Sequence, residues 1–346
     1  MNPYIMSIFL LGLGLGTTIT FMSSHWLLAW MGLEINTLAI IPLMAQHHHP
    51  RSVEASTKYF LTQATAAAMI LFASSTNAWI TGQWDINELS HPMSSTIMML
   101  GLALKIGLAP LHTWLPEVLQ GLDLTTGLIM STWQKLAPFS LLVQMNLNNS
   151  VMITMAIMST MIGGWGGLNQ TQLRKILAYS SIAHIGWMIL VLQFSPSLTL
   201  ITLMIYIFMT FSIFCLFKMN KTTSINSLAT SWSKSPTITA LSPLILLSLG
   251  GLPPLTGFGP KWMILSELTK QDLNMVATIT ALSALLSLYF YLRLSYAMTL
   301  TLSPNTTPIT NQWRFNTKQP TIHLSISTML SLTLLPLLPG IMTIVS

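Results

Sequence analysis

The sequence predicts an all-α integral membrane protein, and three observations support that prediction. Hydrophobic residues make up 52% of the 346 residues and charged residues only 6%, whereas a soluble domain carries about 25% charged residues. Apolar runs of about 20 residues, long enough to cross a bilayer, recur from one end of the chain to the other. No segment is long or polar enough for a soluble domain, which argues against a nucleotide-binding fold or a peripheral catalytic domain.

We expect about eleven membrane spans, two of them broken. They lie near 4–22, 25–45, 56–80, 93–118 (broken), 123–143, 149–168, 173–193, 197–218, 237–267 (broken), 274–297 and 323–344. The first run has neither a basic start nor a small-residue cleavage site, so we interpret it as a retained helix and not as a signal peptide. The longer connections, 219–236 and 298–322, are rich in Lys, Ser, Thr, Asn and Pro, as exposed loops are.

A ten-residue pattern interrupts two of these spans. Residues 107–116 read GLAPLHTWLP and residues 251–260 read GLPPLTGFGP, which places the two copies 144 residues apart. A broken backbone at membrane depth is tolerated only where protein or a water-filled cavity supplies hydrogen-bond partners. An odd number of spans separates the two breaks, so equivalent helices should cross in opposite directions. We therefore expect one transmembrane domain, 1–346, with inverted five-helix repeats at 1–143 and 149–297 and an appended helix at 323–344.

Loop charge predicts the orientation of the chain. With each broken helix counted as one crossing, nearly all loop cations fall on one side of the membrane: Arg51, Lys58, Arg174, Lys175, Lys218, Lys221, Lys234, Arg293, Arg314 and Lys318. The other side carries Lys270 with Asp85, Glu88 and Asp272. The positive-inside rule then puts the N-terminus on the cytoplasm-like side and the C-terminus on the opposite side. The net charge of +6 is explained by these loops and does not indicate a nucleic-acid partner.

Four ionisable side chains are predicted to lie inside the membrane: Glu34, Lys105, Lys135 and Lys261. A charge at the centre of a membrane helix costs about 2.5–3.5 kcal/mol on insertion scales, so each needs a partner or a use. Glu34 and Lys105 form the natural pair, and Lys135 is the nearest further acceptor. Lysine suits proton transfer because burial readily changes its protonation, whereas arginine stays charged. The alternative is a static ion pair between helices, with Lys135 or Lys261 extending to the interface.

The remaining polar residues leave several possibilities open. His112, inside the first break, and His184, in the middle of a span, either relay protons or serve as buried hydrogen-bonded histidines. Glu117 and Asp123 either feed protons inward or cap half-helices. His47-His48-His49 lacks a fourth ligand nearby, so a solvated loop is favoured over a metal site.

Several chemistries have no support in the sequence. The single cysteine, Cys215, excludes an internal disulfide and a cysteine-rich metal or iron–sulfur site. Gly163-Gly164-Trp165-Gly166-Gly167 lies within a span and indicates close helix packing, not a phosphate loop. We therefore expect no cofactor and no metal on this chain, and no redox catalysis by it alone.

Five segments carry a family resemblance: 1–3 (MNP), 24–28 (SHWLL), 54–63 (EASTKYFLTQ), 133–138 (WQKLAP) and 250–258 (GGLPPLTGF). They resemble the antiporter-like membrane-arm subunits of respiratory complex I, and the resemblance covers essentially the whole chain. It implies a proton-translocating module of the mitochondrial inner membrane, with the N-terminus in the matrix and the C-terminus in the intermembrane space. The family pattern is a glutamate, a lysine on a broken helix, a central lysine and a terminal lysine on a second broken helix. Glu34, Lys105, Lys135 and Lys261 match this pattern in order.

The resemblance also implies the surroundings of the chain. NADH, FMN, iron–sulfur clusters and ubiquinone would be bound by other subunits. The partners would be neighbouring antiporter-like and small hydrophobic subunits, supernumerary subunits, and lipids such as cardiolipin. Larger relatives have three further helices at the start, which this chain is expected to lack.

The functional hypothesis is a proton relay. Protons would reach Lys105 under the influence of Glu34, pass to Lys135, and continue through His184 to Lys261. Two alternatives remain, a stand-alone cation/proton antiporter and a structural spacer without its own pumping. The second half has no acid at membrane depth comparable to Glu34, so the exit is less well defined than the start.

Overall fold

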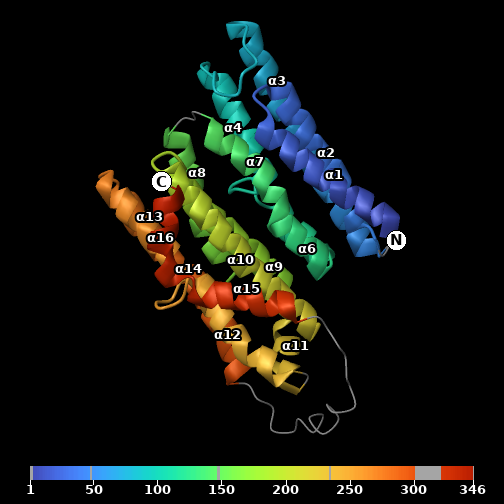
Figure 1. The fold of residues 1–346 in the computed structure, drawn as a ribbon, viewed down its shortest axis with the longest axis vertical. Helices are drawn as coiled ribbons and strands as arrows, with labels where there is room; N and C mark the ends of the chain where they lie inside the picture. Colours follow the sequence, from blue (N-terminus) through green and yellow to red (C-terminus); the bar gives the residue numbers. More distant parts are fainter. Residues whose placement is uncertain (1–2, 47–48, 146–148, 234, 301–320, 346) are drawn as a thin grey trace. The chain divides into compact units, whose positions relative to one another are not determined.

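The computed structural model confirms the all-α expectation. It describes residues 3–46, 49–145, 149–233, 235–300 and 321–345, and within these ranges it contains helices and two isolated β-bridges but no strand. The chain divides into two compact units, Met1–Met158 and Ser159–Ser346. Figure 1 shows both units as bundles of helices.

The first unit holds α1 to α7, and α8 runs across the division. The bounds are α1 Pro3–Met22, α2 Trp26–Met44, α3 Pro50–Thr81, α4 Pro92–Ile106, α5 Trp114–Gly121, α6 Leu124–Ser131, α7 Trp133–Gln144 and α8 Asn149–Gly166. Helices α1 and α2 pack closely because both present glycine. A Cβ on Gly16 would lie 2.9 Å from the carbonyl oxygen of Gly32.

Helix α3 begins earlier than the predicted span at 56–80. Pro50 occupies the first helical turn, and His49 Nδ1 accepts a hydrogen bond from the Arg51 backbone N–H at 3.2 Å. Both features favour a helix start at this point. The 32 residues of α3 correspond to about 48 Å of helix. The helix is therefore longer than the roughly 30 Å hydrocarbon core, and Lys58, predicted in a basic loop, lies within it.

The second unit holds the remaining elements. Their bounds are α9 Leu173–Leu192, α10 Pro196–Asn220, α11 Ile225–Ala229, η1 Thr230–Ser233, α12 Pro236–Gly250, α13 Phe258–Lys270, α14 Asn274–Thr299, α15 Ile322–Thr333, η3 Leu335–Leu337 and α16 Leu338–Val345. The prediction of an exposed loop at 219–236 is wrong in part, because this segment contains the short helices α11 and η1. Ser224 and Ser227 form a capping box at the start of α11, and Leu228 is buried. Most of the other predicted loop, with Arg314 and Lys318, lies outside the described residues.

Within the described residues, five helices are long and apolar enough to cross a membrane: α1, α2, α9, α10 and α14. A sixth span results if α15 and the following helix count together, although they are bent by 63°. Pro336 and Pro339 lie at this bend and lack the N–H donors that would continue the helix. The chain is thus a multi-pass membrane protein, while the count of about eleven spans stays a prediction.

Both helix breaks occur where the repeated pattern predicts them. Helix α4 ends at Ile106 and α5 begins at Trp114, while α12 ends at Gly250 and α13 begins at Phe258. A shift of 144 residues superimposes all of these boundaries, as well as the starts of α4 and α12. Each break also contains a cis peptide bond, Ala109–Pro110 in the first and Pro253–Pro254 in the second.

The same backbone cap ends both half-helices. Gly107 and Gly251 have φ values of 85° and 79°, in the left-handed region that glycine tolerates best. The Gly107 N–H donates to the Ala103 carbonyl at 2.9 Å, and the Gly251 N–H donates to the Leu247 carbonyl at 3.1 Å. The repeated glycine therefore ends each helix in a defined way, which explains why the sequence pattern located the breaks.

Candidate functional site

The first candidate site begins at the end of α4, where Lys105 is only 6% exposed. The last carbonyl groups of a helix have no partner within the helix, and here other side chains supply partners. Trp114 Nε1 donates to the Leu104 carbonyl at 3.0 Å, and Gln63 Nε2 lies 3.5 Å from the Lys105 carbonyl. The Lys105 ammonium itself is buried without a hydrogen-bond partner. The break therefore fixes the backbone around Lys105 while its Nζ atom stays available.

A cavity of about 20 Å³ joins Lys105 to Lys135. By this measure, about 10–15 Å³ is enough for one water molecule. Its lining is rich in polar side chains: Asn36, Thr37, Tyr59, Gln63, Lys105, Gln134 and Lys135. Water in this cavity would have several hydrogen-bond partners, so the site has both the room and the polarity to hydrate the two lysines.

Lys135 lies beside an interruption that was not predicted within the span at 123–143. Helix α6 ends at Ser131, α7 begins at Trp133, and the Lys135 N–H bonds the Thr132 carbonyl at 3.3 Å. Pro138 lies inside α7, where it withholds a helical hydrogen bond from the Gln134 carbonyl four residues earlier, so its effect begins after the interruption at Thr132. Lys135 is 6% exposed and, like the other two membrane lysines, lies within one turn of an irregular backbone segment.

Glu34 lies on α2, and its Oε2 atom is buried without a hydrogen-bond partner. Among the described residues no ion pair joins it to Lys105. Asn36, two residues later, accepts hydrogen bonds from Gln134 Nε2 at its Oδ1 (3.3 Å) and at its backbone oxygen (3.4 Å). The Gln134 amide thus connects the helix of Glu34 to the start of the helix of Lys135, a link that sequence reasoning missed.

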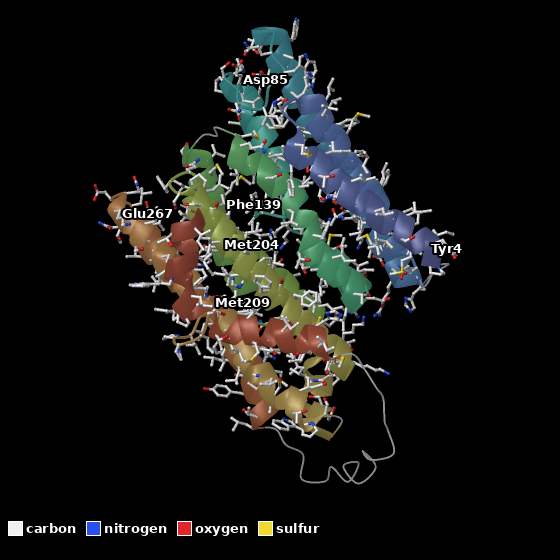
Figure 2. The ribbon with its side chains drawn as sticks, viewed as in Figure 1. Tyr4, Asp85, Phe139, Met204, Met209 and Glu267 are labelled. Carbon is white, nitrogen blue, oxygen red and sulfur yellow. The ribbon has the colours of Figure 1, made fainter. Side chains whose placement is uncertain are left out.

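The second candidate site surrounds Lys261, in the first turn of α13. Its Nζ atom donates to the Gly250 carbonyl at 2.7 Å, at the end of α12. Two cavities of about 20 and 10 Å³ have Lys261, His184 and Trp187 in common. Met209 on α10, labelled in Figure 2, lines the larger one. The His184 ring packs against Tyr206, with 5.5 Å between ring centroids. The structure therefore brings the two predicted residues of the second half together.

The other predicted relay histidine, His112, lies inside the first break. Its Nδ1 atom is 3.3 Å from the Pro110 carbonyl oxygen. It does not line the cavity shared by Lys105 and Lys135, so its role stays a prediction.

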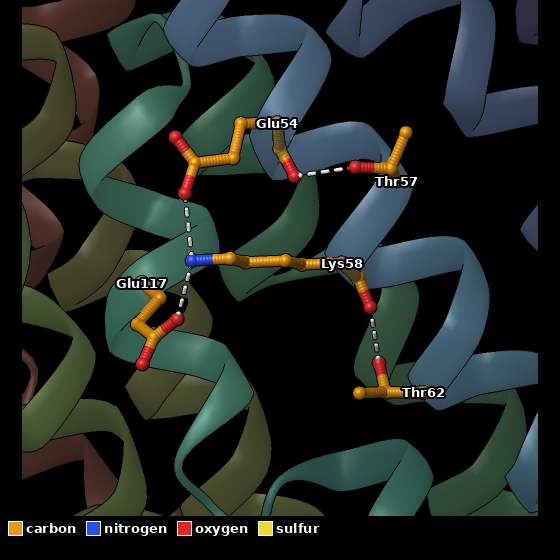
Figure 3. A network of polar contacts seen from close by, with 5 residues as sticks. All are labelled: Glu54, Thr57, Lys58, Thr62 and Glu117. Atoms are coloured by element: carbon orange, nitrogen blue, oxygen red, sulfur yellow. Dashed lines mark hydrogen bonds and ion pairs between the residues drawn. The ribbon is translucent and has the colours of Figure 1, made fainter.

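Glu117 forms an ion pair with Lys58 at 2.8 Å, and Lys58 also pairs with Glu54 at 2.8 Å (Figure 3). Lys58 and Glu117 are 59 residues apart, so no local pattern indicates their contact. The hydrogen bond and the charge of Lys58 hold the pKa of Glu54 below its ordinary value. All three side chains are well exposed, as expected at the rim of a membrane protein. Asp123 is the N-cap residue of α6.

No group of three or more His, Cys, Asp or Glu side chains that could hold a metal ion occurs in the part of the chain that the structure describes. His49 caps α3 through its Nδ1 atom, whereas His47 and His48 lie outside the described residues. Glu267, which sequence reasoning did not weigh, lies in the last turn of α13 (Figure 2) and pairs with Lys270 at 3.2 Å.

Broken membrane helices, each with a lysine at the break and a water-sized cavity beside it, are the arrangement typical of secondary transporters, whose sites lie at discontinuous helices. Residues 23–287 match the family described as "NADH:quinone oxidoreductase/Mrp antiporter, TM", and residues 288–342 match "NADH dehydrogenase subunit 2 C-terminus". The chain belongs to the NADH-ubiquinone oxidoreductase chain 2 family, which confirms the resemblance noted from the sequence motifs.

The relatives cover the chain almost completely. NADH-ubiquinone oxidoreductase chain 2 of Tetraodon nigroviridis is 70% identical, over 99% of each chain. The same subunit of Salmo salar is 67% identical over 100% of each.

Solved structures agree with this assignment. A chain of respiratory complex I from Thermus thermophilus is 26% identical with a TM-score of 0.86, covering 98% of this chain and 79% of that one. A chain of the Mrp complex from Dietzia has the same fold, with 17% identity and a TM-score of 0.74, over 82% of this chain and 58% of that one.

Proposed function

We propose that this chain takes part in proton translocation as a membrane-arm subunit of respiratory complex I. The observation that carries the proposal is the cavity that Lys105 and Lys135 share beside a helix break. Two cations lining one water-sized cavity inside a membrane protein are costly without a use. Family membership supports the same conclusion, because the relatives are subunits of NADH-ubiquinone oxidoreductase.

The chemistry of the first unit is proton transfer between lysines through water. Lys105 Nζ has no fixed hydrogen-bond partner, so water in the cavity is its nearest means of proton exchange. An ionised Glu34, whose Oε2 atom is buried, would favour the charged form of a nearby lysine, and loss of water favours the neutral form. A change in the charge of Glu34 or in the hydration of Lys105 therefore makes Lys105 bind or release a proton. Lys135 accepts that proton across the cavity.

In the second unit the relay continues through His184 and Lys261, which line common cavities. Imidazole accepts a proton on one nitrogen and releases one from the other, so His184 suits the intermediate position. Lys261 is the terminal carrier. His112 is a further candidate at the first break.

The proposal includes the arrangement of the chain in the membrane. The matching boundaries of the two broken helices support an internal repeat, and the loop cations support an inverted one. We place about eleven spans in the inner mitochondrial membrane, with the N-terminus in the matrix and the C-terminus in the intermembrane space. NADH, FMN, iron–sulfur clusters and ubiquinone are handled by other subunits. Neighbouring membrane subunits, supernumerary subunits and lipids such as cardiolipin surround the chain.

The test uses intact complex I carrying Lys105→Met, reconstituted into liposomes. We expect normal assembly and fewer protons moved per electron delivered to quinone. Lys270→Met is the matched control, because Lys270 is 70% exposed and should pump normally. A normal proton-to-electron ratio for Lys105→Met would overturn the relay.

Two other outcomes would favour different functions. Exchange of Na⁺ for H⁺ by the purified chain in liposomes would indicate a stand-alone antiporter. Full pumping after neutralising Glu34, Lys105, Lys135 and Lys261 together would indicate a structural spacer.

A further inference from the structure

The two membrane lysines at the helix breaks have different surroundings. Lys105 precedes its break and its Nζ atom has no hydrogen-bond partner. Lys261 follows its break and reaches back, so that Nζ donates to the Gly250 carbonyl at 2.7 Å. Gly250 is the last residue of α12, where carbonyl groups lack partners within the helix. The peptide dipoles give such a helix end roughly half a negative charge, which favours an ammonium group.

Gly251 leaves room for this contact. A Cβ atom at Gly251 would lie 2.9 Å from Cδ and 3.0 Å from Nζ of Lys261. Gly107 has the same backbone conformation at the first break, but a Cβ there would meet Leu115 at 2.8 Å. The glycine that ends the helix therefore faces the apolar side chain of Leu115 at the first break, and it faces Lys261 at the second.

We propose that the C-terminal end of α12 is the electrostatic partner of Lys261, in the place of an acidic side chain. The first unit has Glu34, whereas the two acids in the sequence of the second, Glu267 and Asp272, line neither cavity beside Lys261. The charged lysine docks on the Gly250 carbonyl, with Gly251 as a positioning residue. When the ammonium group loses its charge the dock weakens, and the side chain is released toward the cavity it shares with His184.

The contact between Lys261 Nζ and the Gly250 carbonyl is present in the structure. Its role in proton transfer rests on the proposed function. Three ionisable side chains from other helices line the two cavities next to Lys261: His184 from α9, Tyr206 from α10 and Tyr291 from α14. Glu267 and Lys270 lie on α13 itself and pair with each other.

The first experiment measures the dock directly by amide hydrogen exchange in intact complex I. Lys261→Met should speed exchange in residues 251–258 roughly tenfold, because a hydrogen bond from a charged donor to the end of α12 is lost. Lys105→Met is the matched control and should not speed exchange in residues 107–114, since its Nζ atom bonds no backbone group. Unchanged exchange in residues 251–258 would overturn the dock. This result does not depend on whether the relay pumps.

The second experiment compares Gly251→Asn with Gly251→Asp, which have nearly the same shape and both tolerate the left-handed conformation. Each displaces Lys261, but only the aspartate supplies a new negative partner. We expect Gly251→Asn to reduce the protons moved per electron and Gly251→Asp to restore them toward wild type. Gly82→Asn is the backbone control, with a φ of 75° and no atom within 4 Å of an added Cβ.

Equal losses in the asparagine and aspartate variants would show that the glycine is needed only for shape, which would overturn its electrostatic role. If neither variant assembles, the exchange experiment alone decides.

Discussion

Replacing Lys105 with methionine should stabilise the chain while it reduces proton transfer. Lys105 is 6% exposed and its Nζ atom has no hydrogen-bond partner. Methionine has a similar length, is flexible and carries no polar group that needs a partner. The substitution therefore removes a polar group that no protein atom hydrogen-bonds, with little change in packing.

The expected gain follows from the state of the lysine. A charged lysine at the centre of a membrane helix costs about 2.5–3.5 kcal/mol. A neutral amine buried without a hydrogen bond costs about 1–3 kcal/mol. Methionine should therefore stabilise α4 by about 1–3 kcal/mol, which corresponds to roughly 5- to 150-fold slower local opening.

Amide hydrogen exchange in α4 of intact complex I measures this gain. Lys261→Met is the contrasting variant, because it removes a hydrogen bond to the Gly250 carbonyl at the end of α12 and should therefore not slow exchange there. Faster exchange in α4 after Lys105→Met would show that Lys105 has a stabilising partner, and would refute the reasoning.

Three further predictions concern contacts around the site. Glu117→Gln should leave the thermal stability of the complex unchanged, because the ion pair with Lys58 is exposed; a clear drop in the melting temperature would contradict this. Gly32→Ala should destabilise the packing of α1 on α2 by about 1–3 kcal/mol, because the new Cβ would lie 2.9 Å from the Gly16 carbonyl oxygen; native protection against proteolysis of α1 would argue against it. Gln134→Leu should lower pumping and loosen the start of α7 by about 1–2 kcal/mol, and unchanged exchange in α7 would count against the link to α2.

The two breaks were predictable because their cause is local. Glycine in the left-handed conformation ends each half-helix, and a following proline cannot continue it. The same local signals appear in both copies at a constant spacing, which is why Gly107 and Gly251 could be assigned equivalent roles. The buried lysines were predictable as well, because charge is rare in this chain.

The features of the site that could not be predicted depend on contacts between residues far apart in the sequence. Lys58 and Glu117 are joined across 59 residues, and Gln134 meets Asn36 across 98. The interruption at Thr132 has no glycine or proline at the break itself, so no local signal in the sequence marks it. Sequence reasoning found His184 but no acidic partner for Lys261 in the second half. The hydrogen bond to the Gly250 carbonyl could not be found in this way, because any residue type can supply a backbone carbonyl.

The central claim is that the lysines predicted to lie inside the membrane, Lys105, Lys135 and Lys261, carry protons. It is tested most directly by the number of protons moved per electron in liposomes with complex I carrying Lys135→Met, since Lys135 lies between the two breaks in the proposed order. The account predicts an assembled complex with a reduced ratio, while the exposed control Lys270→Met keeps the normal ratio. A normal ratio in both variants would contradict it.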